Sequence, residues 1–201
     1  MNCLDRAIRA PASEWLPFGA DTDSFRTQAV EKSIFAYSMG RRHEPLHQAL
    51  VQYCTERGLE YRVTTGGEIA NSQELVQLVA RSKYFVVTPP NLDNPGRTGR
   101  FSPLTMRYLE GIAAGTRLLG VVPQSGEFDE LLPRDAIFEV APDGSDLAER
   151  LDFDQRRWIE AQACVARARD TVLAQHSWRR RAEQIYRRLR DGSPTGWTSS
   201  S

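Results

Sequence analysis

The chain of 201 residues contains very little lysine. Only Lys32 and Lys83 carry an ammonium group, so nearly all of the positive charge is arginine. Net charge is also absent, because 26 basic residues are balanced by 26 acidic ones. A neutral chain has no overall field that attracts nucleic acid or an anionic membrane, so charge favours neither partner. Among so many arginines, residue type alone is weak evidence of function.

Long apolar runs and cysteine motifs are missing as well. No run approaches the ~20 apolar residues that span a bilayer, and the N-terminus has no hydrophobic signal core. Cys3, Cys54 and Cys164 are far apart and show neither zinc-site nor disulfide spacing, so we expect small, unpaired thiols in a reducing cytoplasm. His43 and His47 are four residues apart without a third metal ligand. Neither the GxGxxG fingerprint nor a P-loop motif occurs.

Short apolar runs alternate with helical patterns from Lys32 onward. The runs are rich in Val, Ile, Phe and Tyr, which is typical of strands that are covered on both faces. They lie at 33–37, 61–64, 83–88, 117–122 and 136–140. Helices are predicted between them at 44–57, 72–81 and 103–114. This alternation predicts an α/β fold with a doubly wound parallel sheet.

Four parts are expected along the chain. Residues 1–30 have little regular pattern and are expected to form a linker. Residues 31–152 should form the Rossmann-like domain, and residues 153–190 the C-terminal helices. Residues 191–201 are rich in Gly, Ser, Thr and Pro, and we predict that they are disordered.

The C-terminal helices are rich in arginine. Residues 150–190 contain eleven arginines and five acidic residues. A nucleic-acid site would combine a basic stripe with exposed aromatic residues, whereas Trp158 and Trp178 fall on the apolar helix faces. We therefore expect the tryptophans in the core, the arginines in solvent, and no nucleic-acid partner.

The segment between the third and fourth predicted strands is the most informative. Ser102 suits an N-cap and Pro103 the first helical position, while Gly115 suits the end of the helix. Arg107 and Glu110 lie three residues apart on one face of this helix, whose first turn would direct free amides toward an anion. The pattern predicts a site for a phosphorylated, hydroxyl-rich ligand.

Polar and glycine-rich segments follow the predicted strands, where ligands bind in an open α/β sheet. Gly40 places a flexible turn beside Arg41 and Arg42, and one of these guanidinium groups could clamp a diphosphate. Glu110 could accept hydrogen bonds from two ribose hydroxyls. The alternatives are a pair of surface arginines and an exposed glutamate that pairs with Arg107.

Taken together, these segments resemble the C-terminal, donor-binding domain of a GT-B fold glycosyltransferase of the glycosyl transferases group 1 kind. The resemblance extends from about residue 15 to residue 190, in the order in which that family's motifs occur. The matching segments are WLPFGAD at 15–21, SMGRR at 38–42, LEGIAAGT at 109–116, PDGSDLA at 142–148 and HSW at 176–178.

The resemblance implies that the domain at 31–152 binds a nucleotide diphosphate sugar and that the enzyme transfers the sugar without a metal or other cofactor. It implies catalytic roles for Glu110, which would hold the donor ribose, and for Arg41, which would neutralise the leaving diphosphate. The substrate-binding positions that it implies are Gly40, Arg42, Ser102, Thr105 and Arg107.

Some positions depart from the family pattern. Ser102 stands where the first of two paired glutamates is usual, and the lysine that follows the GR motif is replaced by Arg42 or His43. The segment at 105–108 is closer to a subgroup in which Thr105 and Arg107 hold the donor.

A GT-B enzyme has two Rossmann-like domains, and the sequence has no counterpart of the N-terminal, acceptor-binding one. We therefore expect a glycosyltransferase domain that binds donor and needs an acceptor domain, which could lie on another chain. A fragment, a truncated reading frame and half of a two-chain enzyme are the alternatives. The second functional hypothesis is a non-catalytic nucleotide-sugar-binding or scaffold module that works with a partner chain.

Overall fold

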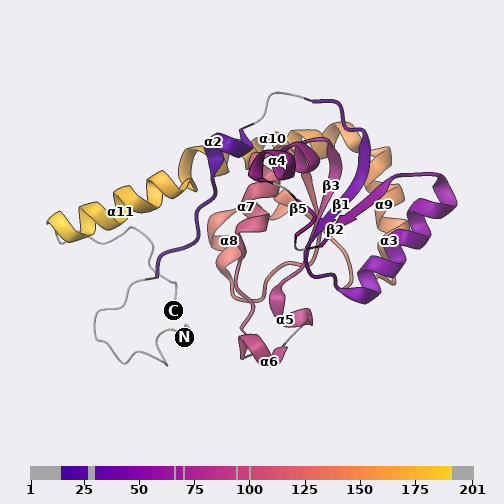
Figure 1. The fold of residues 1–201 in the computed structure, drawn as a ribbon, viewed down its shortest axis with the longest axis horizontal. Helices are drawn as coiled ribbons and strands as arrows, with labels where there is room; N and C mark the ends of the chain where they lie inside the picture. Colours follow the sequence, from indigo (N-terminus) through magenta and orange to yellow (C-terminus); the bar gives the residue numbers. More distant parts are fainter. Residues whose placement is uncertain are drawn as a thin grey trace.

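The protein is an α/β domain built on one parallel sheet (Figure 1). The computed structural model describes residues 15–26, 30–65, 67–69, 71–93, 95–99 and 101–191. The strands are β1 (Ile34–Met39), β2 (Tyr61–Thr64), β3 (Ser82–Val87), β4 (Arg117–Gly120) and β5 (Ile137–Glu139). They are ordered β2-β1-β3-β4-β5, and every neighbouring pair is parallel. The predicted doubly wound sheet is confirmed, with each predicted strand within two residues of its observed ends.

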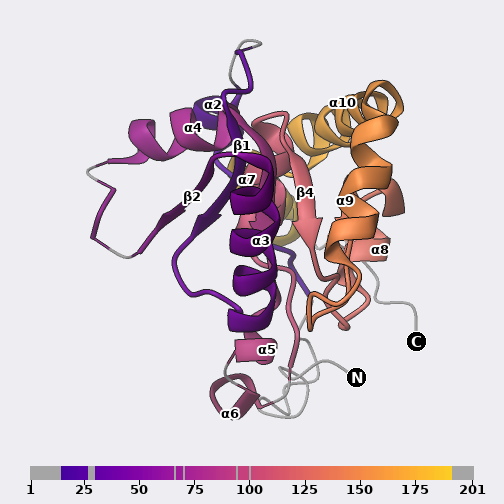
Figure 2. The same ribbon diagram turned by 90° about the vertical axis from the view of Figure 1, so that its right-hand side faces the viewer.

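Helices cover both faces of the sheet (Figure 2). The longer ones are α3 (Glu44–Arg57), α4 (Ser72–Ala80), α7 (Met106–Ala113), α9 (Leu147–Arg156), α10 (Trp158–Gln175) and α11 (Trp178–Asp191). The short ones are α2 (Thr22–Phe25), α5 (Pro90–Asp93), α6 (Pro95–Thr98), α8 (Glu127–Leu131) and the 3-10 turn η1 (Arg134–Ala136). Within the described residues, every helix is too short or too polar to cross a lipid bilayer.

The sheet separates two hydrophobic clusters. Phe35 and Tyr84 face α3 and α9, where Leu50 and Leu151 are fully buried. Their neighbours along the strands point the other way, toward α4, α7, α8 and α10, so that Phe85 packs in the second cluster. Because both faces are covered, most successive residues in the middle of β1, β3 and β4 are apolar, and this is why the runs in the sequence are continuous rather than alternating.

Helix α7 starts later than the sequence pattern predicts. It begins at Met106 with Thr105 as its N-cap, whereas Ser102 and Pro103 lie in the extended segment before it. The buried Ser102 hydroxyl instead accepts a hydrogen bond of 3.1 Å from the amide of Gln124. The prediction of Ser102 as N-cap was therefore wrong, because this long-range contact with the turn after β4 replaces the local capping signal.

The small residues of α7 allow this helix to approach the sheet closely. A Cβ atom placed on Gly111 would lie 2.7 Å from side-chain atoms of both Leu118 and Phe85. Real Cβ atoms essentially never come so close, so a larger residue at 111 would force these side chains or the helix itself to shift. This contact fixes the position of α7 over the sheet.

Helix α11 extends away from the rest of the domain, beside the N-terminal segment (Figure 1). Ala20 forms a parallel bridge with Ser177, so this segment pairs with the start of α11. The apolar stripe of α11 is largely in solvent: Trp178 is 44% exposed, Tyr186 62% and Leu189 81%. The prediction that Trp178 packs into the core was therefore wrong, whereas Trp158 does pack against the α3 and α9 cluster.

Most arginines of this region are exposed, but Arg169 and Arg188 are half-buried and Arg181 is fully buried. Arg181 is 1% exposed, and its guanidinium donates to backbone oxygens of Pro17 at 2.9 Å and Gln175 at 3.2 Å. It also donates to Nδ1 of His176 at 2.7 Å. The corner between α10 and α11 is thus tied to the N-terminal segment by a buried arginine, contrary to the expectation of solvated arginines.

The predicted division between residues 31–152 and 153–190 falls inside α9. The first fourteen residues of the predicted linker at 1–30 and the predicted disordered tail at 191–201, apart from Asp191, lie outside the described residues.

Candidate functional site

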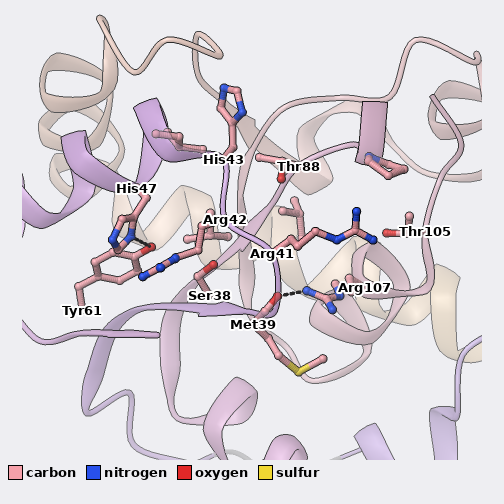
Figure 3. A pocket seen from close by; sticks show the side chains of 14 residues that line it. Ser38, Met39, Arg41, Arg42, His43, His47, Tyr61, Thr88, Thr105 and Arg107 are labelled. Carbon is pink, nitrogen blue, oxygen red and sulfur yellow. Dashed lines mark hydrogen bonds between the residues drawn. The ribbon is translucent and has the colours of Figure 1, made fainter. Parts of the chain in front are cut away.

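A cavity lies at the point where the order of the strands reverses. The chain passes from β1 to β2 on one side and then returns to β3 on the other side of β1. Open α/β sheets bind ligands at the carboxyl ends of the strands beside such a point. The cavity has a volume of about 190 Å³ and is lined by the ends of β1 and β3 and the starts of α3 and α7 (Figure 3). This is smaller than the ~300 Å³ at which ligand pockets usually begin, so the cavity encloses only part of a nucleotide-sized ligand.

Four of the predicted site residues line this cavity: Arg41, Arg42, Thr105 and Arg107. Arg41 extends toward Thr105 and Arg107, whereas Arg42 extends toward Tyr61 (Figure 3). None of the described residues that line the cavity is an aspartate or a glutamate. The walls therefore present positive charge and hydrogen-bond donors, which suit a ligand with several negatively charged oxygens.

Gly40 and Arg107 fit against each other at the end of β1. The guanidinium of Arg107 donates a hydrogen bond to the backbone oxygen of Met39 (Figure 3). Gly40 has a φ of 82°, and a Cβ atom there would lie 2.8 Å from a terminal nitrogen of Arg107. Burial lowers the pKa of Arg107, and the charge of Glu110 opposes this effect. A guanidinium stays charged at neutral pH, so Arg107 brings a fixed positive charge into the cavity.

Three predicted site residues do not line the cavity: Gly40, whose contact with Arg107 is described above, Ser102 and Glu110. Ser102 is buried and holds the turn after β4, as described above. Glu110 lies three residues beyond Arg107 on α7 and is half-buried. Burial raises the pKa of Glu110, the charge of Arg107 opposes that rise, and the charge of Asp21 adds to it. Glu110 thus interacts with one cavity arginine while its own side chain lies outside the cavity.

Further polar residues line the cavity and were not predicted as site residues: Ser38, His43, His47, Tyr61 and Thr88. His47 Nδ1 and the Tyr61 hydroxyl lie 3.1 Å apart. Burial lowers the pKa of His47, and the positive charge of Arg42 lowers it further. Burial raises the pKa of Tyr61 to about 12, although a hydrogen bond with Ser38 opposes the rise. Both rings are therefore neutral at pH 7.

Some of these residues could have been found from the sequence. Ser38 and Thr88 are polar residues at the ends of predicted strands, so the search of strand ends already pointed to them. His43 and His47 were considered only as metal ligands, and no three metal-binding side chains converge in the described part of the chain. Tyr61 begins β2, and only the packing of α3 over the sheet brings it to the cavity.

Comparison with known proteins identifies relatives of this fold and sequence. A sequence model of the family described as glycosyl transferase-like matches residues 34–187, well over half of the chain. Among solved structures, sucrose-phosphate synthase from Thermosynechococcus elongatus is similar, with a TM-score of 0.64 and 20% identity over 94% of this chain. The match covers 56% of that protein, so the chain spans little more than half of its length. No curated protein matches the sequence significantly.

Proposed function

Because the chain belongs to the glycosyl transferase-like family, we propose that it forms the donor-binding half of a glycosyltransferase. Its ligand is a nucleotide diphosphate sugar, and the diphosphate occupies the cavity at the ends of β1 and β3. The observation that carries this proposal is the convergence of Arg41, Thr105 and Arg107 on one cavity without a carboxylate among its described lining residues.

The chemistry of transfer explains why two guanidinium groups are useful there. The bond between the anomeric carbon of the sugar and the diphosphate oxygen breaks, and the electron pair stays with the diphosphate. The acceptor hydroxyl forms the new bond to the anomeric carbon and loses its proton. Arg41 and Arg107 stabilise the negative charge that develops on the leaving diphosphate, and Arg42 contributes a further positive charge.

Thr105 is suited to bind the same phosphate groups. It is the N-cap of α7, but its side chain makes no capping hydrogen bond. Its hydroxyl and the first amides of α7 can therefore donate to a phosphate oxygen. Gly40 has an indirect role, since its lack of a side chain leaves room for Arg107.

The rest of the donor extends beyond the small cavity. We assign the ribose to Glu110, whose carboxylate can accept hydrogen bonds from two hydroxyl groups. Acceptor binding is assigned to a separate domain, because the chain spans only 56% of the similar sucrose-phosphate synthase. We place the reaction in the cytoplasm, since Cys54 and Cys164, the described cysteines, are both free thiols.

Thermal unfolding with added nucleotide tests the proposal. UDP, GDP and ADP are each added at millimolar concentration, and the melting temperature is measured. A nucleotide at a hundred times its Kd stabilises the folded chain by about 2.7 kcal/mol, which raises the Tm of a chain of this size by roughly 5–10 °C. The variants Arg41→Ala, Arg107→Ala and Glu110→Ala should each reduce the shift for the nucleotide that binds.

The matched control is Arg179→Ala, which removes an arginine that lies on α11 with its side chain 86% exposed. This variant should keep the full shift. If none of the three nucleotides changes the Tm of the unmodified chain, the proposed function is wrong.

A second candidate function is a non-catalytic module that binds a partner chain, and the exposed stripe on α11 favours it. Trp178, Ile185, Tyr186 and Leu189 form an apolar surface of the kind that marks interaction sites. This candidate predicts a tight complex with an acceptor-type domain that transfers no sugar when nucleotide sugar and acceptor are supplied. Sugar transfer by the reconstituted pair would exclude it.

A further inference from the structure

The cavity has a second end, away from the residues that we assign to the diphosphate. Arg41 extends toward Thr105 and Arg107, but Arg42 turns in the opposite direction, toward Tyr61 and Ser38 (Figure 3). The side chains of two neighbouring arginines thus lie at opposite ends of one cavity. A single diphosphate at the Arg107 end uses Arg42 only as a more distant positive charge, so the guanidinium of Arg42 is available to bind another group.

The second end offers hydrogen-bond donors and few acceptors. His47 Nδ1 and the Tyr61 hydroxyl are 3.1 Å apart, and the Tyr61 hydroxyl also bonds with Ser38. Each of these groups therefore already has a hydrogen-bond partner. The guanidinium of Arg42 has five N–H donors and no acceptor. Among the described lining residues, no carboxylate or side-chain amide supplies the missing acceptor.

This chemistry is unsuited to a neutral sugar. Each sugar hydroxyl has a proton to donate, and an enclosed hydroxyl without an acceptor loses free energy. A carboxylate or a phosphate has only acceptor oxygens, and it matches a guanidinium through two parallel hydrogen bonds.

We infer that the Arg42 end of the cavity binds a second oxyanion beside the diphosphate, with Arg42 as the residue that selects it. The oxyanion is either the carboxylate of an acidic sugar in the donor or a phosphate that binds together with the nucleotide. The inference rests on the proposed function, because it takes the Arg107 end as the diphosphate site.

Calorimetric titration separates the two sources. The first arm compares UDP-glucose with UDP-glucuronic acid, which carries a carboxylate in place of the hydroxymethyl group. If the thermal test selects GDP, the pair is GDP-mannose and GDP-mannuronic acid. If it selects ADP, the pair is ADP-glucose and ADP-glucuronic acid. We expect the acidic sugar nucleotide to bind about tenfold more tightly, as a charged hydrogen bond allows. The second arm titrates inorganic phosphate into the complex with the nucleoside diphosphate alone. Saturable phosphate binding there, without a preference in the first arm, identifies the phosphate source.

The variant Arg42→Ala distinguishes this site from general charge attraction. It should reduce the preference for the acidic sugar, or the binding of phosphate, at least tenfold, and it should weaken the plain nucleoside diphosphate far less. Arg62→Ala is the matched control, because this exposed arginine follows Tyr61 on β2 but does not line the cavity. It should change neither measurement.

Two negative results have different meanings. If the nucleoside diphosphate binds but Arg42 strengthens the binding of neither oxyanion, this inference is wrong and the proposed function stands. If no nucleotide binds at all, the proposed function fails and this inference fails with it.

Discussion

At the residue scale, Gly40 sets the position of the Arg107 guanidinium. A side chain at this position meets two penalties: the left-handed φ of 82° and a 2.8 Å approach to the terminal nitrogen of Arg107. The left-handed φ lowers the free energy of unfolding when the residue is not glycine. Displacement of the Arg107 guanidinium weakens ligand binding. A suitable pair of variants separates these two effects.

We predict that Gly40→Ala weakens nucleoside diphosphate binding about tenfold, because Arg107 loses a charged hydrogen bond to the phosphate. It should also lower the free energy of unfolding by about 1 kcal/mol, the cost of a left-handed alanine. Gly58→Ala is the control: Gly58 has a φ of 62°, but a Cβ atom there would have no neighbouring atom within 4 Å. Urea denaturation and calorimetry should show equal destabilisation but a binding defect for Gly40→Ala alone. Equal affinities for the two variants would contradict the role of Gly40.

His176 gives the protein a specific sensitivity to acid. Its Nδ1 accepts a hydrogen bond from Arg181, and its Nε2 lies 3.0 Å from the backbone oxygen of Leu131. The ring must therefore be neutral, with the proton on Nε2. Burial and then the charge of Arg181 lower the pKa of His176 from 6.5 to about 4.

The unfolded chain binds this proton first as the pH falls, so the folded state loses stability. The neutral His176 ring contributes about 3 kcal/mol to the free energy of unfolding. This contribution is complete above pH 6.5 and is lost as the pH falls from about 6.5 to about 4. We predict that the free energy of unfolding of His176→Gln changes less over this range than that of the unmodified chain. Urea denaturation at pH 7.5, 5.5 and 4.5 measures the difference, and parallel pH profiles would exclude the effect.

Helix α11 is the element whose sequence and environment disagree. Its apolar stripe has the spacing of a buried helix face, but the described chain leaves most of the stripe in solvent. Helix α9 has the same kind of stripe and does bury it, against the sheet and α3. The difference lies in the neighbours of each helix and not in its own residues.

A pair of leucine variants measures this difference. Leu189 on α11 is 81% exposed, whereas Leu151 on α9 is fully buried. We predict that Leu189→Ala changes the free energy of unfolding by less than about 0.5 kcal/mol, while Leu151→Ala lowers it by about 2–5 kcal/mol. Chemical denaturation of both variants provides the test. A large loss from Leu189→Ala would mean that α11 is covered in the isolated chain.

At the scale of the whole molecule, the described residues are organised around one sheet, with a hydrophobic cluster on each of its faces. Strands β1, β3, β4 and β5 each contribute side chains to both clusters, so neither cluster can be lost while the other keeps its packing. Within the described residues there is therefore no internal boundary of the kind that separates independent domains.

We predict a single cooperative unfolding transition for the unmodified chain. Leu50→Ala on the α3 face and Leu109→Ala on the α7 face should each lower the free energy of unfolding by about 2–5 kcal/mol, since both side chains are fully buried. In each variant, far-ultraviolet circular dichroism and tryptophan fluorescence should give the same midpoint. Separate midpoints for the two signals would show that the faces unfold independently.

Local patterns in the sequence determined much of the fold. The strands could be predicted because an apolar run between turn residues is itself the property that a buried strand needs. The bounds of α3 matched because its ends are set by adjacent residues, with Pro45 in the first turn and Gly58 after the last. Arg41 and Arg42 could be proposed because ligands bind at the carboxyl ends of parallel strands, and Arg107 because of its place on the predicted helix, whereas Thr105 was proposed from the family resemblance alone.

Only the tertiary structure decided the remaining features, because they depend on residues far apart in the chain. The Ser102 hydroxyl accepts a hydrogen bond from the amide of Gln124 instead of capping a helix. Helix α7 therefore begins later, at Met106. Tyr61 reached the cavity because α3 crosses above its strand. The sequence by itself determined which segments are apolar and where they turn, since those properties are local. Which apolar faces find a partner, and which polar groups meet in one cavity, was decided by how the elements pack.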